Sequence, residues 1–414
     1  MAKPTIRFIG FDDEWEQRKL SELSDFISKG ATPTTYGYDW QESGIPFFRN
    51  DAIKDNQFIY GDFSYISEEA NETLQRSEIH GDDILVAITG DIGKAGIVPK
   101  SIEKGNINQH TARVRIIKDA IPYFVYQSLI TDEQQKKYQL IKTGLSMPQL
   151  SLQQIRDTIV LCPSVEEQSM IGECFINLDH LITLHQRKCD ETKKLKKYML
   201  QKMFPQNGSK VPEIRFKRFT DEWEQRKLDD VAEFSKGSGY SKGDLIESGT
   251  PIILYGRLYT KYETIISDVD TFVEAEDGSV YSKGGEVIIP ASGETAEDIA
   301  RAASVDKSGV LLGGDLNVVM PNKDINSAFL AISISNGSSQ RELARKAQGK
   351  SVVHIHNEEI RNLVVPFPTM TEQNKIENYF TDLDHLITLH QRKCEELKKL
   401  KKFMLQNMFT QKNK

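Results

Sequence analysis

An internal duplication constrains this chain more than any other feature of its sequence. Residues 6–20 (IRFIGFDDEWEQRKL) recur as residues 214–228 (IRFKRFTDEWEQRKL), and residues 178–204 recur as residues 383–409 with scattered changes. The two copies of the first block are offset by 208 residues (214 − 6), and the two copies of the second block by 205 (383 − 178). A repeat unit of this length is a duplicated domain and not the unit of a solenoid. Between these blocks the halves diverge almost completely, which indicates two different recognition domains on nearly identical frames. The alternative, a recent duplication without functional division, predicts similar drift along the whole repeat.

The duplication divides the chain into six segments. We expect a first variable domain with its leading segment at 1–164, a first helix at 165–204, a linker at 205–213, a second variable domain with its leading segment at 214–369, a second helix at 370–410 and a tail at 411–414. A chain of 414 residues suits two domains of this kind.

The two repeated helices carry the spacing of a coiled coil. Seam residues recur at alternating steps of four and three, at Ile171, Phe175, Leu178, Ile182, His185, Cys189 and Thr192, and at Ile376, Phe380, Leu383, Ile387, His390, Cys394 and Leu397. Neither helix is expected to be stable alone in water, so each copy should pair with the other. Pairing about a two-fold axis makes the helices antiparallel. The expected fold is α+β, with two pseudo-symmetric domains separated by a long antiparallel two-helix coiled coil.

A second line of apolar residues widens the apolar face of each helix beyond a two-helix seam. Four leucines on this line are candidates for binding a partner protein: Leu181, Leu184, Leu386 and Leu389. Trp15 and Trp223 in the repeated Asp-Glu-Trp-Glu segment are further candidates, because tryptophan is a common interface anchor. The alternative for both tryptophans is a core role that packs the leading segment.

Both variable domains mix strand-like runs with helical stretches. Short apolar runs bounded by Gly, Asp and Pro predict strands at 84–89, 112–117 and 158–161 in the first domain, and at 286–290, 317–320 and 362–365 in the second. Each domain is therefore expected to be α+β.

Polar and basic residues in and near the Gly-rich loops are candidates for contacts with nucleic acid. Arg is suited to O6 and N7 of guanine, and Asn or Gln to N6 and N7 of adenine. In the first domain the candidates are Lys29, Thr32, Arg49, Asn50, Thr89, Lys94, Gln109, His110, Lys142, Thr143, Ser146 and Gln149. In the second they are Lys236, Ser238, Tyr240, Tyr255, Arg257, Ser292, Lys350, Ser351 and His354. For each single residue, an ordinary surface or turn role is the competing interpretation.

The sequence offers no catalytic centre. No G-x-G-x-x-G follows a strand, and neither Asn-Pro-Pro-Tyr nor Asp-Pro-Pro-Tyr, the tetrapeptides of amino-methyltransferases, occurs. His180 and His185 are too far apart along their helix to share one face, as are His385 and His390. We predict no catalytic residue, no metal site and no cofactor in this chain.

Composition and charge predict a cytoplasmic protein that depends on partners to bind DNA tightly. No apolar run reaches the roughly 18 residues of a membrane span, and the four cysteines show no CxxC spacing. The net charge is −7, although nonspecific affinity for a duplex comes mainly from Lys and Arg. We therefore expect cations gathered on one face and weak binding by the chain alone.

Several short motifs, in one order and partly repeated, carry a resemblance to a known family. They are residues 14–20 (EWEQRKL) with their copy, residues 81–86 (GDDILV), Pro163 followed by Glu167-Gln168, and the two LDHLITLHQ helices. Over essentially the whole chain, this pattern resembles the specificity subunit of type I restriction–modification systems.

The resemblance implies a subunit that recognises DNA and leaves the chemistry to others. It implies a bipartite double-stranded target with an unread spacer, and adenine methylation directed by this subunit. It also implies two methyltransferase subunits and two restriction subunits that cut and translocate DNA, with S-adenosylmethionine, ATP and Mg²⁺ belonging to those partners. One departure is Gly284-Gly285-Glu286 in place of Gly-Asp-Asp. Pro290 is also expected to interrupt the following strand, which weakens the transfer of a loop role to Ser292.

Other functions fit the same residues. A stand-alone DNA-binding regulator would need similar variable domains but no methyltransferase partner. An assembly scaffold would need the helices, with variable domains that bind protein. A DNA methyltransferase or nuclease is the enzymatic alternative, and the missing cofactor and acidic metal motifs place it last.

Overall fold

The computed structural model describes residues 3–144, 146–206, 208–349 and 352–409. It consists of two compact units, one formed by Met1–His185 with Arg392–Lys414 and the other by Gln186–Gln391. We call these the first and second units and describe each by itself. Within the described residues, no helix combines the length and apolar character needed to cross a membrane.

The first unit contains two four-stranded sheets. One has the antiparallel order β2 (Ser24–Lys29), β11 (Thr111–Ile116), β8 (Ile84–Ala87) and β9 (Ala95–Ile97). The other has the order β6 (Ser64–Ile66), β3 (Ile45–Phe48), β10 (Gly105–Ile107) and β7 (Glu78–Ile79), in which β3 and β10 are parallel. Two short antiparallel pairs join β1 (Glu16–Lys19) to β12 (Ile159–Cys162) and β4 (Ile53–Lys54) to β5 (Gln57–Phe58). The short helices are α1 (Glu68–Thr73), α2 (Pro122–Leu129), α3 (Asp132–Ile141) and α4 (Leu152–Arg156).

The second unit repeats this plan with changes. Its main sheet has the order β14 (Ala232–Lys236), β22 (Leu316–Pro321), β18 (Glu286–Pro290), β20 (Ala303–Val305) and β16 (Ile265–Ile266). A three-stranded sheet has the order β17 (Phe272–Val273), β15 (Thr250–Ile253) and β21 (Leu311–Leu312), with β15 and β21 parallel. The short pairs are β13 (Glu224–Lys227) with β24 (Val364–Phe367) and β19 (Ser292–Gly293) with β23 (Val353–His354). The short helices are α6 (Arg257–Thr260), α7 (Ala296–Ile299), α8 (Ser327–Ile334), α9 (Gly337–Lys346) and α10 (Asn357–Arg361).

Pro290 does not interrupt its strand, contrary to the expectation from sequence. It is the last residue of β18 and lies in register with Leu316 of β22. A proline at the end of a strand is tolerated because the ladder loses only one donor there.

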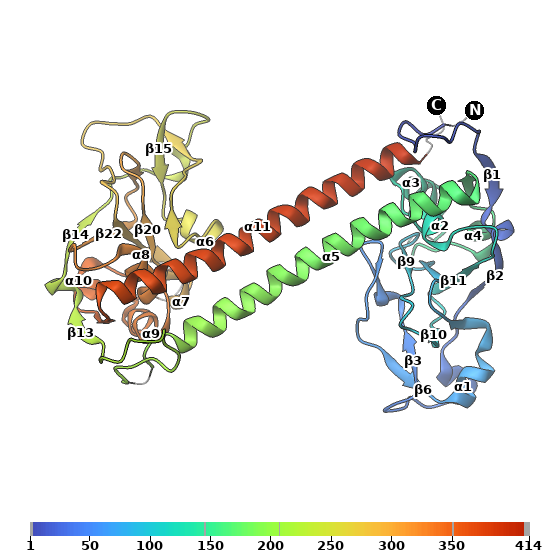
Figure 1. Ribbon diagram of the computed structural model, residues 1–414, viewed down its shortest axis with the longest axis horizontal. Coiled ribbons are helices and arrows are strands. Elements are labelled where there is room, and N and C mark those ends of the chain that lie inside the picture. Colours follow the sequence, from blue (N-terminus) through green and yellow to red (C-terminus); the bar gives the residue numbers. More distant parts are fainter. Residues whose placement is uncertain (1–2, 145, 207, 350–351, 410–414) are drawn as a thin grey trace. The chain divides into compact units, whose positions relative to one another are not determined.

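Two long helices, α5 (Val165–Lys202) and α11 (Met370–Met408), each contribute one end to each unit. In the first unit, Lys401 Nζ of α11 lies 2.7 Å from Asp179 Oδ1 of α5, and the rings of Phe409 and Phe175 are 5.9 Å apart. From the first contact to the second, the residue number increases in α11 and the segment after it, from 401 to 409, and decreases in α5, from 179 to 175. The helix ends therefore pair antiparallel (Figure 1).

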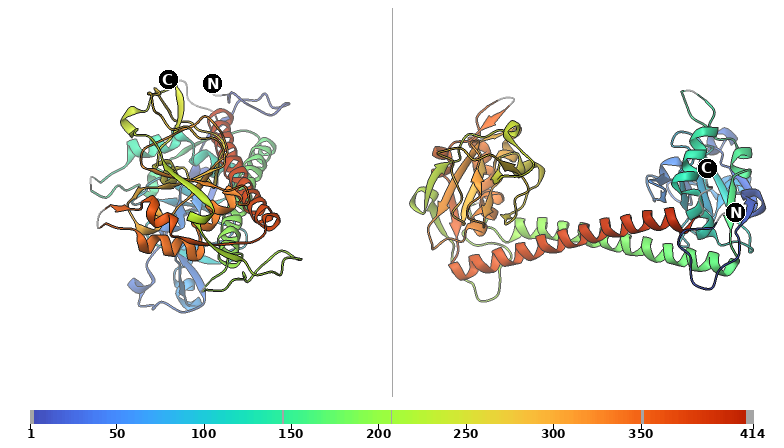
Figure 2. Two further views of the ribbon diagram at one scale, coloured as in Figure 1. Left: turned by 90° about the vertical axis from the view of Figure 1, so that its left-hand side faces the viewer. Right: turned by 90° about the horizontal axis from the view of Figure 1, so that it is seen from above.

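The second unit repeats this pairing with the roles of the helices exchanged. Lys196 Nζ of α5 lies 2.5 Å from Asp384 Oδ1 of α11, and the rings of Phe204 and Phe380 are 6.2 Å apart. Within each unit the α/β domain lies against the paired helix ends (Figure 2). The predicted α+β fold with an antiparallel pair of long helices is confirmed.

Both repeated tryptophans belong to the cores, which confirms the core role considered for them and corrects the alternative of exposed partner anchors. Trp15 is 6% exposed and packs edge-on against Phe124 and Phe409. Trp223 is 1% exposed and packs against Phe204 and Phe329. Because each ring joins the leading segment to the end of a long helix, the repeated motif is explained by packing.

Candidate nucleic-acid interface

Two parallel strands bring the first group of candidate residues together. Parallel strands β3 and β10 end at the same edge of their sheet, with Phe48 in register with Ile107. Arg49 and Asn50 therefore follow one strand where Gln109 and His110 follow its neighbour. The amide of Asn108 donates to the carbonyl of Phe48 at 3.2 Å and closes this edge.

A close backbone approach adds the end of β2 to the same edge. A Cβ atom at Gly30 would lie 2.0 Å from the carbonyl oxygen of Ile107, so only glycine fits here. Lys29 is exposed beside it, and Thr32 Oγ1 donates to Gln109 Oε1 at 2.5 Å. The sequence Ser-Lys-Gly thus has a steric reason, which is to let this loop approach β10.

Two further loops complete the group. The amide of Ile88 donates to the carbonyl of His110 at 3.0 Å, which places Thr89 beside it. Thr143 and Gln149 exchange backbone hydrogen bonds, and Gln149 also bridges to Thr89. We call the resulting surface the first loop edge, and it comprises Lys29, Thr32, Arg49, Asn50, Thr89, Gln109, His110, Thr143 and Gln149. Ser146 lies in the loop that joins Thr143 to Gln149.

Two of the lysines predicted as DNA contacts, Lys94 and Lys142, lie away from the centre of the first loop edge. Lys94 lines a surface hollow beside α3, together with Asp132, Gln135 and Leu140. Lys142 is exposed at the end of α3 and donates from Nζ to Gln139 Oε1 at 3.1 Å. The structure therefore does not bring Lys94 into the first loop edge, and it leaves Lys142 at the margin.

The second unit builds the same edge from different residues. A Cβ atom at Gly237 would lie 1.9 Å from the carbonyl oxygen of Gly313, as at Gly30 in the first unit. Ser238 follows and donates from its amide to the carbonyl of Leu312 at 2.9 Å. Tyr255 follows β15, and Lys236 is exposed at the end of β14.

Ser292 occupies the place that Thr89 holds in the first unit. The sequence had made it doubtful that a loop role of the first domain could be assigned to Ser292. Ser292 pairs with His354 through β19 and β23, and its Oγ lies 3.1 Å from His354 Nδ1. Glu286 plays the same part as Asp83, since each carboxylate accepts a hydrogen bond from a backbone amide of the preceding turn. Glu286 Oε2 accepts from the amide of Gly284 at 2.9 Å. In the first unit, Asp83 Oδ2 accepts from the amide of His80 at 2.8 Å.

Arg257 is a structural residue, which corrects its prediction as a DNA contact. Its side chain is 7% exposed and forms ion pairs with Asp270 at 2.6 Å and Glu263 at 2.7 Å. Hydrogen bonds from Lys261 and Arg257 lower the pKa of Asp270 to about 2, so this carboxylate stays charged. The Nη donors of Arg257 are therefore used within its own domain, and its Nε is buried, so this guanidinium is not presented to a ligand as that of Arg49 is.

Three other predicted residues of the second domain need comment. Tyr240 is half-buried, and its hydroxyl pairs with Ser279 Oγ at 2.6 Å and accepts from the amide of Glu276 at 2.8 Å. This tyrosine is held within its own domain. Lys350 and Ser351 lie outside the described residues.

The loop edges of the two units carry chemically different side chains at equivalent positions. Phe48 and Ile253 hold the same place, since they pair with Ile107 and Leu312 of the adjacent parallel strands. Leu254 therefore stands where the first unit has Arg49. By the same register, Gly314 and Asp315 stand where the first unit has Gln109 and His110. Two edges with such different donors and acceptors are suited to different base sequences.

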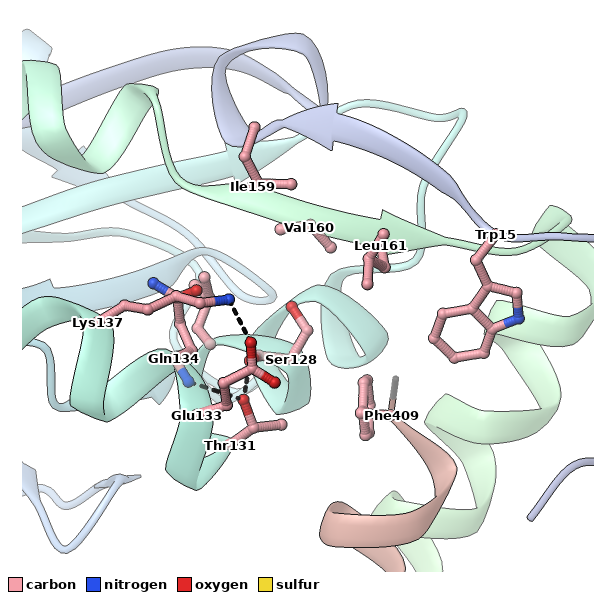
Figure 3. Close-up of a pocket in the computed structure, with 11 residues that line it drawn as sticks. Trp15, Ser128, Thr131, Glu133, Gln134, Lys137, Ile159, Val160, Leu161 and Phe409 are labelled. Atoms are coloured by element: carbon pink, nitrogen blue, oxygen red, sulfur yellow. Dashed lines mark hydrogen bonds and ion pairs between the residues drawn. The ribbon is translucent and has the colours of Figure 1, made fainter. Parts of the chain in front are cut away.

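A pocket beside Trp15 in the first unit is too small to bind a large ligand (Figure 3). It lies between Trp15, Phe409 and β12, with an ion pair of 2.6 Å between Lys137 and Glu133 at its rim. Its volume of about 50 Å³ holds a few water molecules. Pockets for cofactors or drug-sized ligands are typically about 300 Å³ or larger. Among the described residues, no three or more His, Cys, Asp or Glu side chains are grouped as a metal site.

The comparisons with known proteins agree with this geometry. The family model described as the type I restriction modification DNA specificity domain matches twice, at residues 12–194 and 220–399. The chain belongs to this family of type I restriction–modification specificity subunits, whose members recognise DNA targets. It is similar to the specificity subunit of the type I restriction enzyme MjaVIII from Methanocaldococcus jannaschii, at 21% identity over 96% of this chain and 92% of the relative.

Two further likenesses cover different shares of the chain. The EcoBI specificity subunit from Escherichia coli is 29% identical over 38% of this chain and 34% of that protein. The crystal structure of the type I restriction–modification S subunit from M. genitalium has the same fold, with a TM-score of 0.65 at 13% identity over 99% of this chain and all of that one.

Proposed function

We propose that this chain reads a bipartite double-stranded DNA target with an unread spacer and directs adenine methylation and restriction by partner subunits there. The observation that carries the proposal is one loop edge built twice with different side chains. Arg49, Gln109 and His110 in the first unit correspond to Leu254, Gly314 and Asp315 in the second. Identical frames with different recognition residues are what two half-sites require.

The unread spacer is attributed to the long helices. α5 has 38 residues and α11 has 39, so each is about 57 Å long at 1.5 Å per residue. One turn of B-DNA is about 34 Å. Helices longer than one turn support a spacer whose length they set.

Exposed apolar residues on the helices support binding of partner proteins. Leu181, Leu184, Leu386 and Leu389 are 43% to 46% exposed, although they lie on helices whose seam residues are buried or half-buried. Leu195, Tyr198, Leu400 and Phe403 extend this line and are exposed to a similar degree. A repeated apolar line on each helix is suited to two copies of one partner, which we assign to the two methyltransferase subunits. Two restriction subunits would complete the assembly.

The proposed division of labour leaves all chemistry to the partners. S-adenosylmethionine, ATP and Mg²⁺ would bind to the methyltransferase and restriction subunits, in a cytoplasmic complex. Partner subunits would also supply phosphate contacts that a chain of net charge −7 lacks.

The test is co-expression of the chain with its methyltransferase subunit, followed by mapping of new methyladenine across the genome. A split motif that disappears when either protein is omitted is the expected result. A stable complex that produces no methylation would favour a stand-alone DNA binder or a scaffold.

A further inference from the structure

Arg49 is an exposed arginine at the first loop edge. Within the described part of the chain it forms no ion pair, and its one hydrogen bond runs from Nη2 to Ser64 Oγ at 3.4 Å, the long limit for such a bond. Arg115 of the same domain, by contrast, lies 2.7 Å from Asp83. The guanidinium of Arg49 thus keeps its donors for a ligand.

Trp40 holds this guanidinium in place. Arg49 Cζ lies 5.7 Å from the centre of the Trp40 ring, in a cation–π contact. The Trp40 ring in turn packs edge-on at 5.1 Å against Phe47, which is 1% exposed. The next residue, Gln41, donates from its amide to the carbonyl of Tyr65 at 2.9 Å. Because the tryptophan is anchored from both sides, stacking limits the freedom that the arginine would lose on binding.

We propose that Arg49 reads a guanine in the half-site of the first domain and that Trp40 is its positioning residue. This inference rests on the proposed function and names one of its specificity-determining residues. A planar guanidinium with paired N–H donors matches O6 and N7 of guanine in the major groove. Asn50, Gln109 and His110 lie beside Arg49 on the same edge and would contact neighbouring base pairs or phosphates.

The second unit provides the natural substitution for a test. Leu254 holds the place of Arg49 there, so this frame accepts a leucine at the position. Arg49 is exposed, and Arg49→Leu should therefore fold normally. Arg361→Leu is a control in the second unit, because Arg361 also stacks on an aromatic ring, at 4.7 Å over Phe234, but is held by an ion pair of 2.7 Å with Asp229.

The experiment measures binding of the co-expressed complex to duplexes that carry the mapped target, with each guanine replaced in turn by 7-deazaguanine. This base lacks the N7 acceptor and keeps its pairing. At one guanine of one half-site, the replacement should weaken wild-type binding about tenfold. Arg49→Leu should weaken binding to the unmodified duplex by about tenfold to a hundredfold and should abolish the effect of 7-deazaguanine at that guanine. Arg361→Leu should leave the effect unchanged.

Variants of Trp40 separate positioning from folding. Trp40→Phe keeps a ring under the guanidinium and should retain the sensitivity to 7-deazaguanine. Trp40→Ala should lose most of this sensitivity while Arg49 is still present. Equal sensitivity in both variants would overturn the role of Trp40.

Three results would overturn the role of Arg49 and leave the proposed function standing. In one, the fold-losses of binding affinity caused by Arg49→Leu and by 7-deazaguanine multiply at every guanine, which means that the two changes act independently. In another, the substitution weakens all duplexes equally and flattens the salt dependence, as a phosphate contact does. In the third, neither half-site contains a sensitive guanine. A wild-type complex that binds a duplex without the mapped target as tightly as a duplex with it would instead contradict the proposed function and the inference together.

Discussion

Arg7 and Glu167 are joined by two hydrogen bonds of 2.7 Å that clamp the leading segment onto the first turn of α5. The Glu167 side chain is fully buried, and its hydrogen bond with Arg7 raises the pKa of the arginine. Arg215 and Glu372 repeat the clamp in the second unit at 2.7 and 2.8 Å. The leading segment is therefore an integral part of each domain.

Breaking this clamp should destabilise the first unit. Glu167→Gln leaves the half-buried charge of Arg7 uncompensated, and loss of one partner of a buried pair costs about 3 kcal/mol. We expect a lower urea midpoint and faster hydrogen exchange in the leading segment. The neighbouring Glu166 is exposed, so Glu166→Gln is the control and should change little. An equal effect of both substitutions would contradict a specific clamp.

Phe409 should stabilise the first unit as Phe204 stabilises the second. Phe409 packs on Trp15, Phe124 and Phe175 with ring distances of 5.4 to 6.3 Å. Phe409→Ala should lower the free energy of unfolding by about 3 kcal/mol, since it opens a cavity in a buried aromatic cluster. Phe403 is 52% exposed on α11, which ends one residue before Phe409, so Phe403→Ala should have a much smaller effect on chemical denaturation. If the order of these two effects were reversed, the end of α11 would not dock as described.

The exposed leucines should matter for assembly and not for folding. Replacing Leu184 and Leu389 by Ser should reduce the methyltransferase subunit that copurifies with the chain by about tenfold or more, the loss expected when buried interface anchors are removed. The circular dichroism and melting temperature of the chain alone should hardly change. Leu140 is 83% exposed on α3, and Leu140→Ser should leave copurification intact. Unchanged assembly in the double variant would place the partner surface elsewhere.

Helix length should set the spacer of the DNA target. Inserting the same few residues at equivalent exposed positions of α5 and α11 should change the number of unread base pairs and leave both half-sites unchanged. Methylation mapping of the variant reads both quantities at once. A spacer of unaltered length would remove the helices as its determinant.

The periodic elements were predictable from the sequence because their pattern directly reflects burial. The seam residues at alternating steps of four and three are buried or half-buried, as at Ile171, Phe175 and Leu178. The predicted strands at 84–89 and 286–290 appear as β8 and β18.

Residues whose role depends on contacts distant in the sequence or between loops were not predictable. Arg257 resembled a DNA contact because the sequence gives no sign that Glu263 and Asp270 fold over it. Trp40 was missed because it stands in a loop without periodicity, and only the fold brings Arg49 onto its ring. The repeated Trp15 and Trp223 show a related difficulty, since repetition preserves a packing role as readily as a binding role.

The central claim is that two different edges on one frame read two different half-sites. Its most direct test exchanges residues 26–163 for the corresponding domain of another family member and maps methyladenine in cells that contain the methyltransferase subunit. The account predicts a new sequence in one half of the split motif, with the other half and the spacer unchanged. A change in both halves, or in neither, would contradict it.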